Sequence, residues 1–410
     1  MIRGPVSLVL AGIGGMGAVY VGELLDHREA GTFRIAGAVD PEPERCPRLE
    51  ELRAGGVAVF ASLESFYRNR TAELAVVSSP IQHHADQTCL ALAKGSHVLC
   101  EKPVAGTIGE ARRMMEAERE SGRWVSVGYQ WSFSPAVQEL KSDIMAGRFG
   151  RPRRLKCLYL WPRDEAYYRR NDWAGRKRDA AGGWILDGPA QNAMAHDLHN
   201  MFYVLGPERR ASARPVEVEA ELYRAYGIEN YDTAAVRART ADGVEVLLYA
   251  THVPRREKGP VFAYEFERAT VRCSSRTSGV WAELEDGGRK DYGLPDKAPM
   301  AKLWQAIRNV RSGEAGVCGL EAASSQTLCV DGMQDSMPEV RDFPAAMQRT
   351  VEEDGARRVA VEGLDEALEA AYAADALPSE LGFPWTACGR LINLGTQYSF
   401  PNSAGPSGAD

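Results

Sequence analysis

The sequence lacks the features of several protein classes. No apolar run approaches the ~20 residues that a membrane-spanning helix requires. The eight cysteines are spread along the chain without a Cys-x-x-Cys pair, which predicts free thiols in a reducing cytoplasm and argues against disulfides or a zinc knuckle. The net charge is −7 and the lysines and arginines are scattered, which argues against a nucleic-acid partner. Arg3 precedes only a short apolar stretch, so no signal peptide is expected.

Glycine, in contrast, is concentrated near the N-terminus. The stretch VSLVLAGIGGMGAVYVGELL, residues 6–25, places a cluster of glycines between a run typical of a buried strand and an apolar helical segment. Gly12, Gly14 and Gly17 follow the pattern G-x-G-x-x-G. In this pattern the first glycine permits a tight turn, the second lets a pyrophosphate approach the backbone, and the third lets the helix pack closely on the strand. A phosphate there faces unpaired N–H groups and the positive end of the helix dipole.

A carboxylate follows the next predicted strand. Asp40 ends the strand in FRIAGAVDPEPER, at the distance from the glycines where an acid accepts hydrogen bonds from an adenosine ribose. The alternative is that Asp40 caps a turn before Pro41. Strand, glycines and acid together favour dinucleotide binding. NAD is the expected cofactor, because Asp40 repels a 2′-phosphate, and the neighbouring Arg45 keeps NADP as the alternative.

The pattern of predicted elements changes near Gly128. Up to that point strand and helix patterns alternate, as in an α/β domain with a doubly wound parallel sheet. Beyond it, five stretches alternate apolar and polar residues as antiparallel strands do: 153–161, 216–226, 233–241, 244–253 and 262–273. The sequence therefore predicts a Rossmann domain over 1–128 and an α+β domain with a large, mostly antiparallel sheet over 129–376. A C-terminal extension follows over 377–410, and its last ten residues are expected to fray.

The stretch HVLCEKP ends a predicted strand in Glu101-Lys102-Pro103. With the glycine motif, Asp40, SSPIQHHADQTCLALAKG, VGYQWSFSPAV and AGRFGRP, it resembles the Gfo/Idh/MocA family, the glucose–fructose oxidoreductase and inositol dehydrogenase group, over nearly the whole chain. The resemblance implies that Glu101 anchors a loop beside the nicotinamide and that Lys102 points an ammonium group toward the substrate. The predicted cofactor-binding residues are Gly12, Ile13, Gly14, Gly15, Met16, Gly17, Asp40, Ser79, Pro80, His84, Glu101 and Lys102.

A second catalytic motif of that family reads roughly G-G-x-x-x-D-x-G-x-H-x-x-D. The stretch AAGGWILDGPAQNAMAHDLHNMFYVLG fits it in two registers. Aligned from its left end, Gly182, Gly183 and Asp187 match, and the histidine falls on Gln191. Aligned from its right end, the histidine falls on His196. The right-hand register is preferred, because a helix keeps its spacing rigidly whereas the turn before it can absorb inserted residues.

In that register Asn192 replaces the leading acid and His199 the trailing acid. One helix would place Asn192, His196 and His199 at i, i+4 and i+7, on a shared face. The alternative for His199 is a core position. A histidine pair with Asp187 has no further evident ligand, so no metal is predicted. The predicted catalytic residues are Lys102, His196, Asp187, Asn192 and His199.

Residues 161–179, WPRDEAYYRRNDWAGRKRD, are rich in aromatic and basic side chains. Aromatic rings stack on pyranose faces and guanidinium groups bind carboxylates in a bidentate manner, so this loop is a candidate for binding a polyhydroxylated, even anionic, ring. The alternatives are a solvated surface loop and an oligomer contact. The predicted substrate-binding residues are Lys102, Tyr129, Trp161, Arg163, Tyr168, Arg169, Trp173, Asn192 and His196.

The resemblance implies hydride transfer between NAD(P) and a secondary alcohol of a sugar, sugar acid or cyclitol. His196 would take the hydroxyl proton and Lys102 would stabilise negative charge on the oxygen. The alternatives are a redox-neutral lyase or hydrolase with tightly bound NAD, and an NAD-binding regulator without activity. The expected partners are a sugar-like small molecule and copies of the chain in a homodimer or homotetramer through the C-terminal sheet. No membrane association is expected, and the expected location is cytoplasmic.

Overall fold

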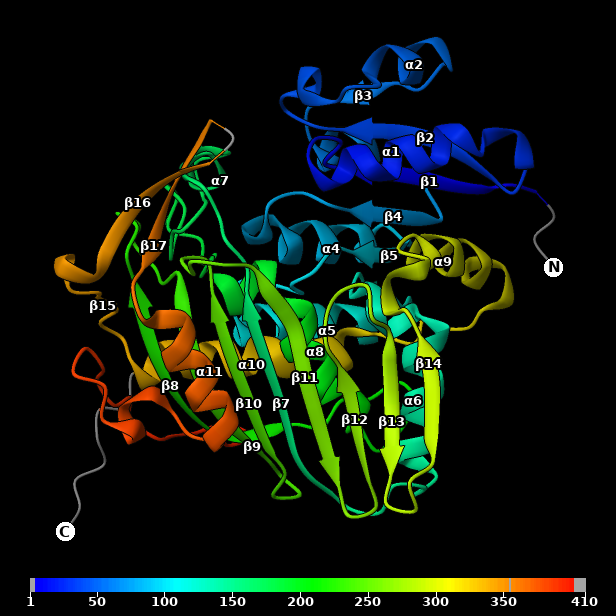
Figure 1. The fold of residues 1–410 in the computed structure, drawn as a ribbon. Helices are drawn as coiled ribbons and strands as arrows, with labels where there is room; N and C mark the ends of the chain where they lie inside the picture. The colour runs from blue at the N-terminus through cyan, green and yellow to red at the C-terminus, as the bar shows by residue number, and fades with distance from the viewer. Residues whose placement is uncertain (1–3, 354, 402–410) are drawn as a thin grey trace. The chain divides into compact units, whose positions relative to one another are not determined.

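The chain forms two compact units (Figure 1), in a computed structural model that describes residues 4–353 and 355–401. The first unit comprises Met1–Ser134 and Ala298–Ser324, and the second comprises Pro135–Lys297 and Ser325–Asp410. A segment that the sequence patterns placed in the second domain, Ala298–Ser324, is thus part of the first unit. The division after residue 128 and the separate extension from residue 377 stay predictions. The fraying expected of the last ten residues falls, except for the first of them, outside the described residues.

A six-stranded sheet, all of whose strand pairs are parallel, forms the centre of the first unit in the order β3-β2-β1-β4-β5-β6. The predicted doubly wound sheet is confirmed. From β1 the chain proceeds outward to β2 and β3 and then crosses to β4, on the other side of β1. The strands are β1 Val6–Ala11, β2 Phe33–Val39, β3 Val59–Phe60, β4 Leu74–Val77, β5 His97–Cys100 and β6 Val125–Val127.

Six helices accompany this sheet. The α5 helix begins directly after Thr107, because the Thr107 hydroxyl accepts the Glu110 N–H and the Glu110 carboxylate accepts the Thr107 N–H. The α9 helix comes from the late segment, and its Leu303 and Ile307 join the core around β1. The helices are α1 Met16–Asp26, α2 Leu49–Ala54, α3 Leu63–Tyr67, α4 His84–Ala93, α5 Ile108–Ser121 and α9 Ala301–Ser312.

The second unit contains a ten-stranded sheet in the order β14-β13-β12-β11-β7-β10-β9-β8-β15, with β18 also paired to β8. Most pairs are antiparallel, as predicted; β7 with β10 and β8 with β15 are parallel. The strands are β7 Pro152–Leu160, β8 Pro215–Arg224, β9 Thr233–Thr240, β10 Glu245–Thr251, β11 Lys258–Phe266, β12 Ala269–Cys273, β13 Val280–Leu284, β14 Arg289–Gly293, β15 Arg341–Asp342 and β18 Ile392–Asn393.

One strand prediction is wrong. Residues 262–273 form the end of β11 and all of β12, joined by a turn at Glu267 and Arg268. The N–H groups of these two turn residues donate to the carbonyl groups of Arg151 and Phe149. The segment that precedes β7 therefore stabilises the turn. The apolar alternation continues across the turn and hides it in the sequence.

Helices cover both faces of this sheet. On one face, the Cys157 thiol of β7 lies 3.9 Å from Asp197 of α8 (Ala195–Val204). On the other, Leu158 packs with Leu364 of α11 (Leu364–Ala374). Successive strand residues point to opposite faces, so α8 and α11 lie on opposite sides. The other elements are α6 Pro135–Met145, α7 Glu165–Arg169, α10 Leu320–Ser336, β16 Gln348–Glu353 and β17 Ala356–Val361.

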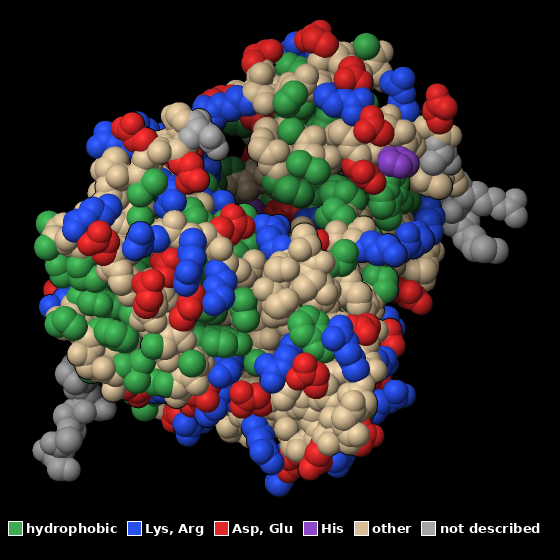
Figure 2. Space-filling view, in the orientation of Figure 1, with side chains coloured by type: hydrophobic (Ala, Val, Ile, Leu, Met, Phe, Trp, Pro, Cys, Tyr) green, Lys and Arg blue, Asp and Glu red, His purple; other side chains and the backbone are tan. Residues whose placement is uncertain are grey.

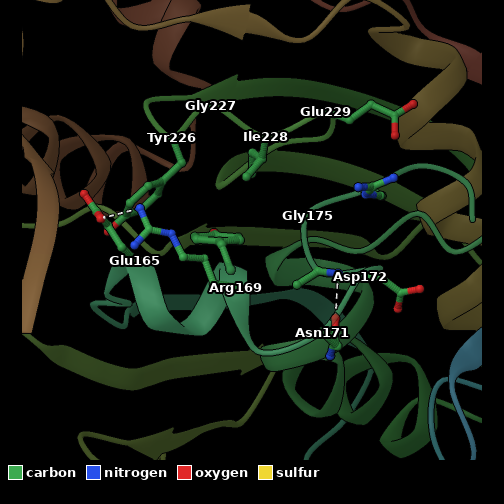
Figure 3. A pocket seen from close by; sticks show the side chains of 12 residues that line it. Glu165, Arg169, Asn171, Asp172, Gly175, Tyr226, Gly227, Ile228 and Glu229 are labelled. Carbon is green, nitrogen blue, oxygen red and sulfur yellow. Dashed lines mark hydrogen bonds and ion pairs between the residues drawn. The ribbon is translucent and has the colours of Figure 1, made fainter.

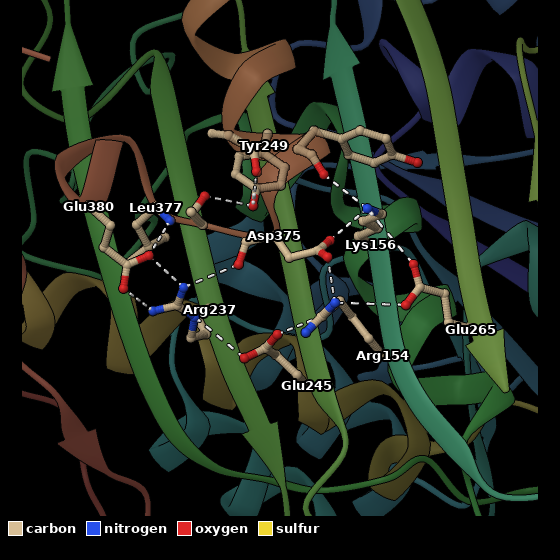
Figure 4. A network of polar contacts seen from close by, with 12 residues as sticks. Arg154, Lys156, Arg237, Glu245, Tyr249, Glu265, Asp375, Leu377 and Glu380 are labelled. Atoms are coloured by element: carbon tan, nitrogen blue, oxygen red, sulfur yellow. Dashed lines mark hydrogen bonds and ion pairs between the residues drawn. The ribbon is translucent and has the colours of Figure 1, made fainter. Parts of the chain in front are cut away.

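Half-buried ion pairs fix the end of α11 to the sheet (Figure 4). Asp375, directly after α11, lies 2.5 Å from Arg154 and 2.6 Å from Lys156, both on β7. Arg237 of β9 binds Glu380 at 2.6 Å. The segment that follows α11 is therefore tied to two strands of the same face.

Charged side chains of both signs are interspersed over the face of the molecule drawn in Figure 2. Within the described residues, no helix combines the length and the apolar character that crossing a bilayer requires.

Candidate functional site

The predicted cofactor residues follow four neighbouring strands of the first unit. The glycine loop follows β1, Asp40 follows β2, Ser79 follows β4 and Lys102 follows β5. Carboxyl ends of parallel strands lie at one edge of a sheet, so these loops share that edge. The connection after β1 leads to one side of the sheet and the connection after β4 leads to the other. Ligands of such sheets bind at this switch point. The structure therefore gathers these residues where a nucleotide site belongs.

The glycine loop is closely packed on one side and open on the other. A Cβ at Gly12 would lie 2.7 Å from the Ser79 nitrogen, and one at Gly17 would lie 2.2 Å from the Gly12 oxygen. A Cβ at Gly15, where φ is 51°, would meet nothing within 4 Å. Gly12 and Gly17 are needed for this close packing, and the exposed backbone at the start of α1 fits a dinucleotide pyrophosphate.

Asp40 is coupled to this loop by its carboxylate. Its Oδ2 accepts the Ile13 N–H and its Oδ1 accepts the Glu42 N–H, both at 2.9 Å. The end of β2 and the glycine loop are thereby held in one arrangement.

Glu101 is buried, and its carboxylate accepts hydrogen bonds from three donor groups. Its Oε1 accepts from the Tyr20 hydroxyl at 2.5 Å and from the Lys302 ammonium, and its Oε2 accepts the Lys102 N–H at 3.1 Å. Lys302 is 1 % exposed and also donates to the Gly128 carbonyl. Burial alone raises the pKa of Glu101, but the Lys302 ammonium and the hydrogen bonds from Lys302 and Tyr20 outweigh burial and lower that pKa below 4.5. The loop that carries Lys102 therefore starts from an ionised, anchored residue.

Sequence reasoning missed Tyr20 and Lys302. Lys302 lies 201 positions from Glu101, and no local pattern links the two. One signal in the sequence could have indicated Lys302. It is a lysine on the buried side of the amphipathic helix α9, next to the core residue Leu303.

His84 is also buried, and it lies between two loops of this edge. Its ring nitrogens lie 2.9 Å from the carbonyl oxygens of Pro103 and Ser79. Burial lowers the pKa of His84 below 6.5. These contacts position the loop of Lys102 against the loop after β4.

In the second unit, the Asp187 carboxylate contacts the loop over 161–179 and the candidate catalytic segment. Its carboxylate accepts the Gly175 N–H at 2.7 Å and the Asn192 side-chain N–H at 2.9 Å, and the Arg170 guanidinium lies 3.8 Å away. The preceding Leu186 has φ 53°, a conformation that leucine rarely adopts. Strained backbone of this kind is typical of functional sites. Asp187 therefore ties the loop over 161–179 to the segment before α8.

The prediction that Asn192 shares one regular helix with the two histidines is wrong. Pro189–Ala193 forms a π-helical turn in which the N–H of Met194 donates to the carbonyl of Pro189, five residues earlier. Met194 then leaves the helical conformation, with φ −111° and ψ 19°, before α8 begins. The wider turn interrupts the 3.6-residue period on which the shared face depends.

The histidines of α8 differ in environment. His196 is half-buried, whereas His199 is 1 % exposed and its ring stacks on Tyr203, with centroids 5.5 Å apart. Burial, and the nearby Lys141, lower the pKa of His199 to about 3, so His199 is neutral at pH 7. Gln191, the histidine position of the other register, is buried and accepts a hydrogen bond from Gln326.

The aromatic side chains expected to bind sugar already have partners. The Trp161 ring stacks on Tyr159 with centroids 5.1 Å apart, and the Arg163 guanidinium lies 3.6 Å from its centroid. The hydroxyl of Tyr168 lies 2.8 Å from His252 Nδ1. The remaining predicted substrate residues are exposed Arg169, half-buried Trp173 beside Arg170, and buried Tyr129 of the first unit.

Among the residues that the structure describes, no cluster of three or more His, Cys, Asp or Glu side chains has the arrangement of a metal site.

A parallel sheet with a glycine loop, a strand-end acid and a buried Glu-Lys-Pro loop at one edge defines a dinucleotide-binding oxidoreductase unit. Residues 6–129 match the oxidoreductase family with an NAD-binding Rossmann fold, and residues 137–276 match the Gfo/Idh/MocA C-terminal domain. The chain belongs to the Gfo/Idh/MocA family, and its first unit is an NAD-binding Rossmann domain.

Individual relatives match part of the chain. It is 34% identical over 157 residues to an inositol 2-dehydrogenase of Streptomyces avermitilis, covering 38% of this chain and 44% of that protein. It is 31% identical over 150 residues to a 1,5-anhydro-D-fructose reductase of Ensifer adhaerens, covering 36% and 42%. These matches thus span less than half of either relative. The fold resembles the WlbA dehydrogenase of Bordetella pertussis, solved with NADH and UDP-GlcNAcA, with a TM-score of 0.66, 20% identity, and coverage of 81% of this chain and 97% of that one.

Proposed function

We propose that the protein is an NAD-dependent dehydrogenase that oxidises a secondary alcohol of a sugar, sugar acid or cyclitol. The observation that carries the proposal is the buried anchoring of the Glu101-Lys102-Pro103 loop at the sheet edge that also holds the glycine loop. The relatives named as dehydrogenases and reductases of such substrates support it. A cytoplasmic location, supported by free cysteines throughout the described residues, and a homodimer or homotetramer through the second-unit sheet stay predictions.

NAD, when bound, supplies the acceptor for the hydride that leaves the alcohol carbon. The residues 12–17 would hold its pyrophosphate, and Asp40 would hold its adenosine ribose. The imidazole of His196 takes the hydroxyl proton, and the Lys102 ammonium stabilises the negative charge that develops on that oxygen. His196 is only partly buried whereas Gln191 and His199 are buried, and this difference supports His196 as the base. Asp187 and Asn192 position the segment that precedes it.

Absorbance at 340 nm, with NAD⁺ and a panel of sugars, uronates and cyclitols, tests the activity. We expect net NADH formation with at least one of them, and a kcat about 10²- to 10⁴-fold lower in His196→Asn. Product without net NADH would instead identify redox-neutral chemistry, and binding of NADH without any turnover would identify a regulator. An unaltered kcat in His196→Asn would exclude that histidine as the base.

Replacing Asp40 tests the cofactor assignment. Hydrogen bonds to a charged group contribute about 1.5–3 kcal/mol, so Asp40→Ser is expected to weaken NADH binding roughly 10- to 100-fold. The same change removes the repulsion of a 2′-phosphate and is expected to strengthen NADPH binding. Fluorescence titration with both nucleotides measures this, with Asp40→Asn as the control that keeps an acceptor but not the charge. If neither variant changes the preference between the nucleotides, Asp40 does not select the cofactor.

A further inference from the structure

A pocket of about 610 Å³ in the second unit is lined mostly by the loop over 161–179 and otherwise by residues 226–229 (Figure 3). Glu165 and Arg169 of α7 line one side, and Asp172 and Glu229 line the other. The turn that contains Gly227, between β8 and β9, closes it from above in that view. Small-molecule sites have volumes of about 300–1,000 Å³, so this pocket is large enough for a ligand.

The walls of the pocket are fixed by buried carboxylates. The Gly175 N–H donates to Asp187 at 2.7 Å, and the Gly175 carbonyl accepts the Asn230 N–H at 2.9 Å. On the opposite wall the Tyr226 N–H donates to the buried Asp232 at 2.9 Å. The pocket is therefore formed before any ligand arrives, which lowers the entropic cost of binding.

Asp187 also connects the pocket with the proposed catalytic segment. One carboxylate oxygen binds the pocket wall at Gly175 and the other binds Asn192, four residues before His196. The wall of the pocket and the segment that leads to His196 are thus bound to the same carboxylate in the second unit.

The charges around the pocket nearly balance. Three carboxylates and two guanidinium groups line it, and Glu165 is bound to Arg169 at 2.8 Å and lies 3.3 Å from Arg357. Carboxylates, guanidinium groups and the amide of Asn171 can all hydrogen-bond hydroxyl groups. A lining with so little net charge favours an uncharged, hydroxyl-rich ligand over a diphosphate.

We propose that this pocket binds a second, uncharged sugar residue of the substrate. The preferred substrate is then a disaccharide or glycoside and not a free monosaccharide, a cyclitol or a nucleotide sugar. This assignment rests on the proposed sugar dehydrogenase function and names its substrate class.

Gly227 allows the pocket to be filled selectively. Its φ lies outside the left-handed region and a Cβ there would meet nothing within 4 Å, so Gly227→Phe can project a ring without a backbone clash. Gly395, also in the second unit and away from the pocket lining, has the same open surroundings, and Gly395→Phe is the matched control. Asp172→Ala, at an exposed lining residue, gives a second variant that removes a polar group without added bulk.

The probes are cellobiose, maltose and lactose, compared with glucose, galactose, myo-inositol and UDP-glucose. Binding to the full chain with NADH is measured by saturation-transfer NMR, and turnover by NADH formation. We expect at least one disaccharide to bind more tightly than the monosaccharides. We expect the ratio of disaccharide to monosaccharide Kd to rise at least tenfold in Gly227→Phe and about threefold in Asp172→Ala, and to stay at the wild-type value in Gly395→Phe.

The proposal is overturned if no disaccharide binds, if UDP-glucose binds more tightly than every disaccharide, or if the ratio is unchanged in both pocket variants. Disaccharide binding that Gly227→Phe weakens, without NADH formation from any probe, supports the pocket and rejects the dehydrogenase function. The opposite outcome is NADH formation from monosaccharides together with a ratio of disaccharide to monosaccharide Kd that Gly227→Phe does not alter. That outcome rejects sugar binding in this pocket and keeps the dehydrogenase function.

Discussion

Lys102→Met is expected to lower kcat for alcohol oxidation about 10²- to 10³-fold, the loss that follows removal of one preorganised group that stabilises a developing oxyanion. Methionine keeps most of the length of the side chain and removes the ammonium group. The backbone of residue 102 still donates to Glu101, so the loop is expected to keep its anchor. The loss should therefore fall on kcat more than on KM.

Steady-state kinetics on the best substrate of the panel measure this effect. Lys94→Met is the matched control, because Lys94 is an exposed lysine just after α4 in the same unit. Lys102→Arg keeps a charge with a different shape and is expected to recover only part of the rate. A kcat of Lys102→Met within a few-fold of the wild type would refute the proposed role.

Lys302→Met is expected to lower the free energy of unfolding of the first unit by about 3–5 kcal/mol, because it leaves the buried Glu101 carboxylate without its cation. The double variant Lys302→Met with Glu101→Gln removes both charges and should recover much of the loss. Hydrogen exchange of peptides from β5 and α9 reports on this unit separately from the other. Equal protection of those peptides in the wild type and in Lys302→Met would show that the pair contributes little.

The same pair predicts a change in the sign of a pH dependence. In the wild type the pKa of Glu101 is below 4.5, so the stabilisation by its ionised form is present above pH 4.5 and is lost as the pH falls through the lowered pKa. Without Lys302, burial raises that pKa, so protonation relieves an uncompensated charge and stability increases as the pH falls toward 5. Between pH 7 and pH 5, titration of Glu101 should leave the hydrogen-exchange protection of β5 unchanged in the wild type and should increase it as the pH falls in Lys302→Met.

The fold was predictable to the extent that it depends on local patterns. The glycine motif and the alternation of the later strands each follow from neighbouring residues, and the structure confirms the elements they predict. The turn at Glu267 was not predictable, because alternation continues through it. The break in the helix at Met194 depends on a π-helical turn, and no residue type in the sequence indicates such a turn.

The candidate site was predictable where it follows motifs along the chain and not where it depends on distant pairing. The assignments of Lys102 and His196 come from motifs and stay predictions. Lys302 and the dual bonding of Asp187 depend on tertiary contacts, to Glu101 and to Gly175, that no periodicity encodes.

The discontinuous first unit also constrains how the protein is made. Domains commonly fold in order as the ribosome releases them. Here the Rossmann sheet cannot complete its core until translation has passed α9, which ends at Ser312, because Leu303 and Ile307 belong to that core. Until then the nascent chain holds Glu101 without its cation, while much of the second sheet has already left the ribosome. The first unit therefore completes its folding late, although most of it is translated first.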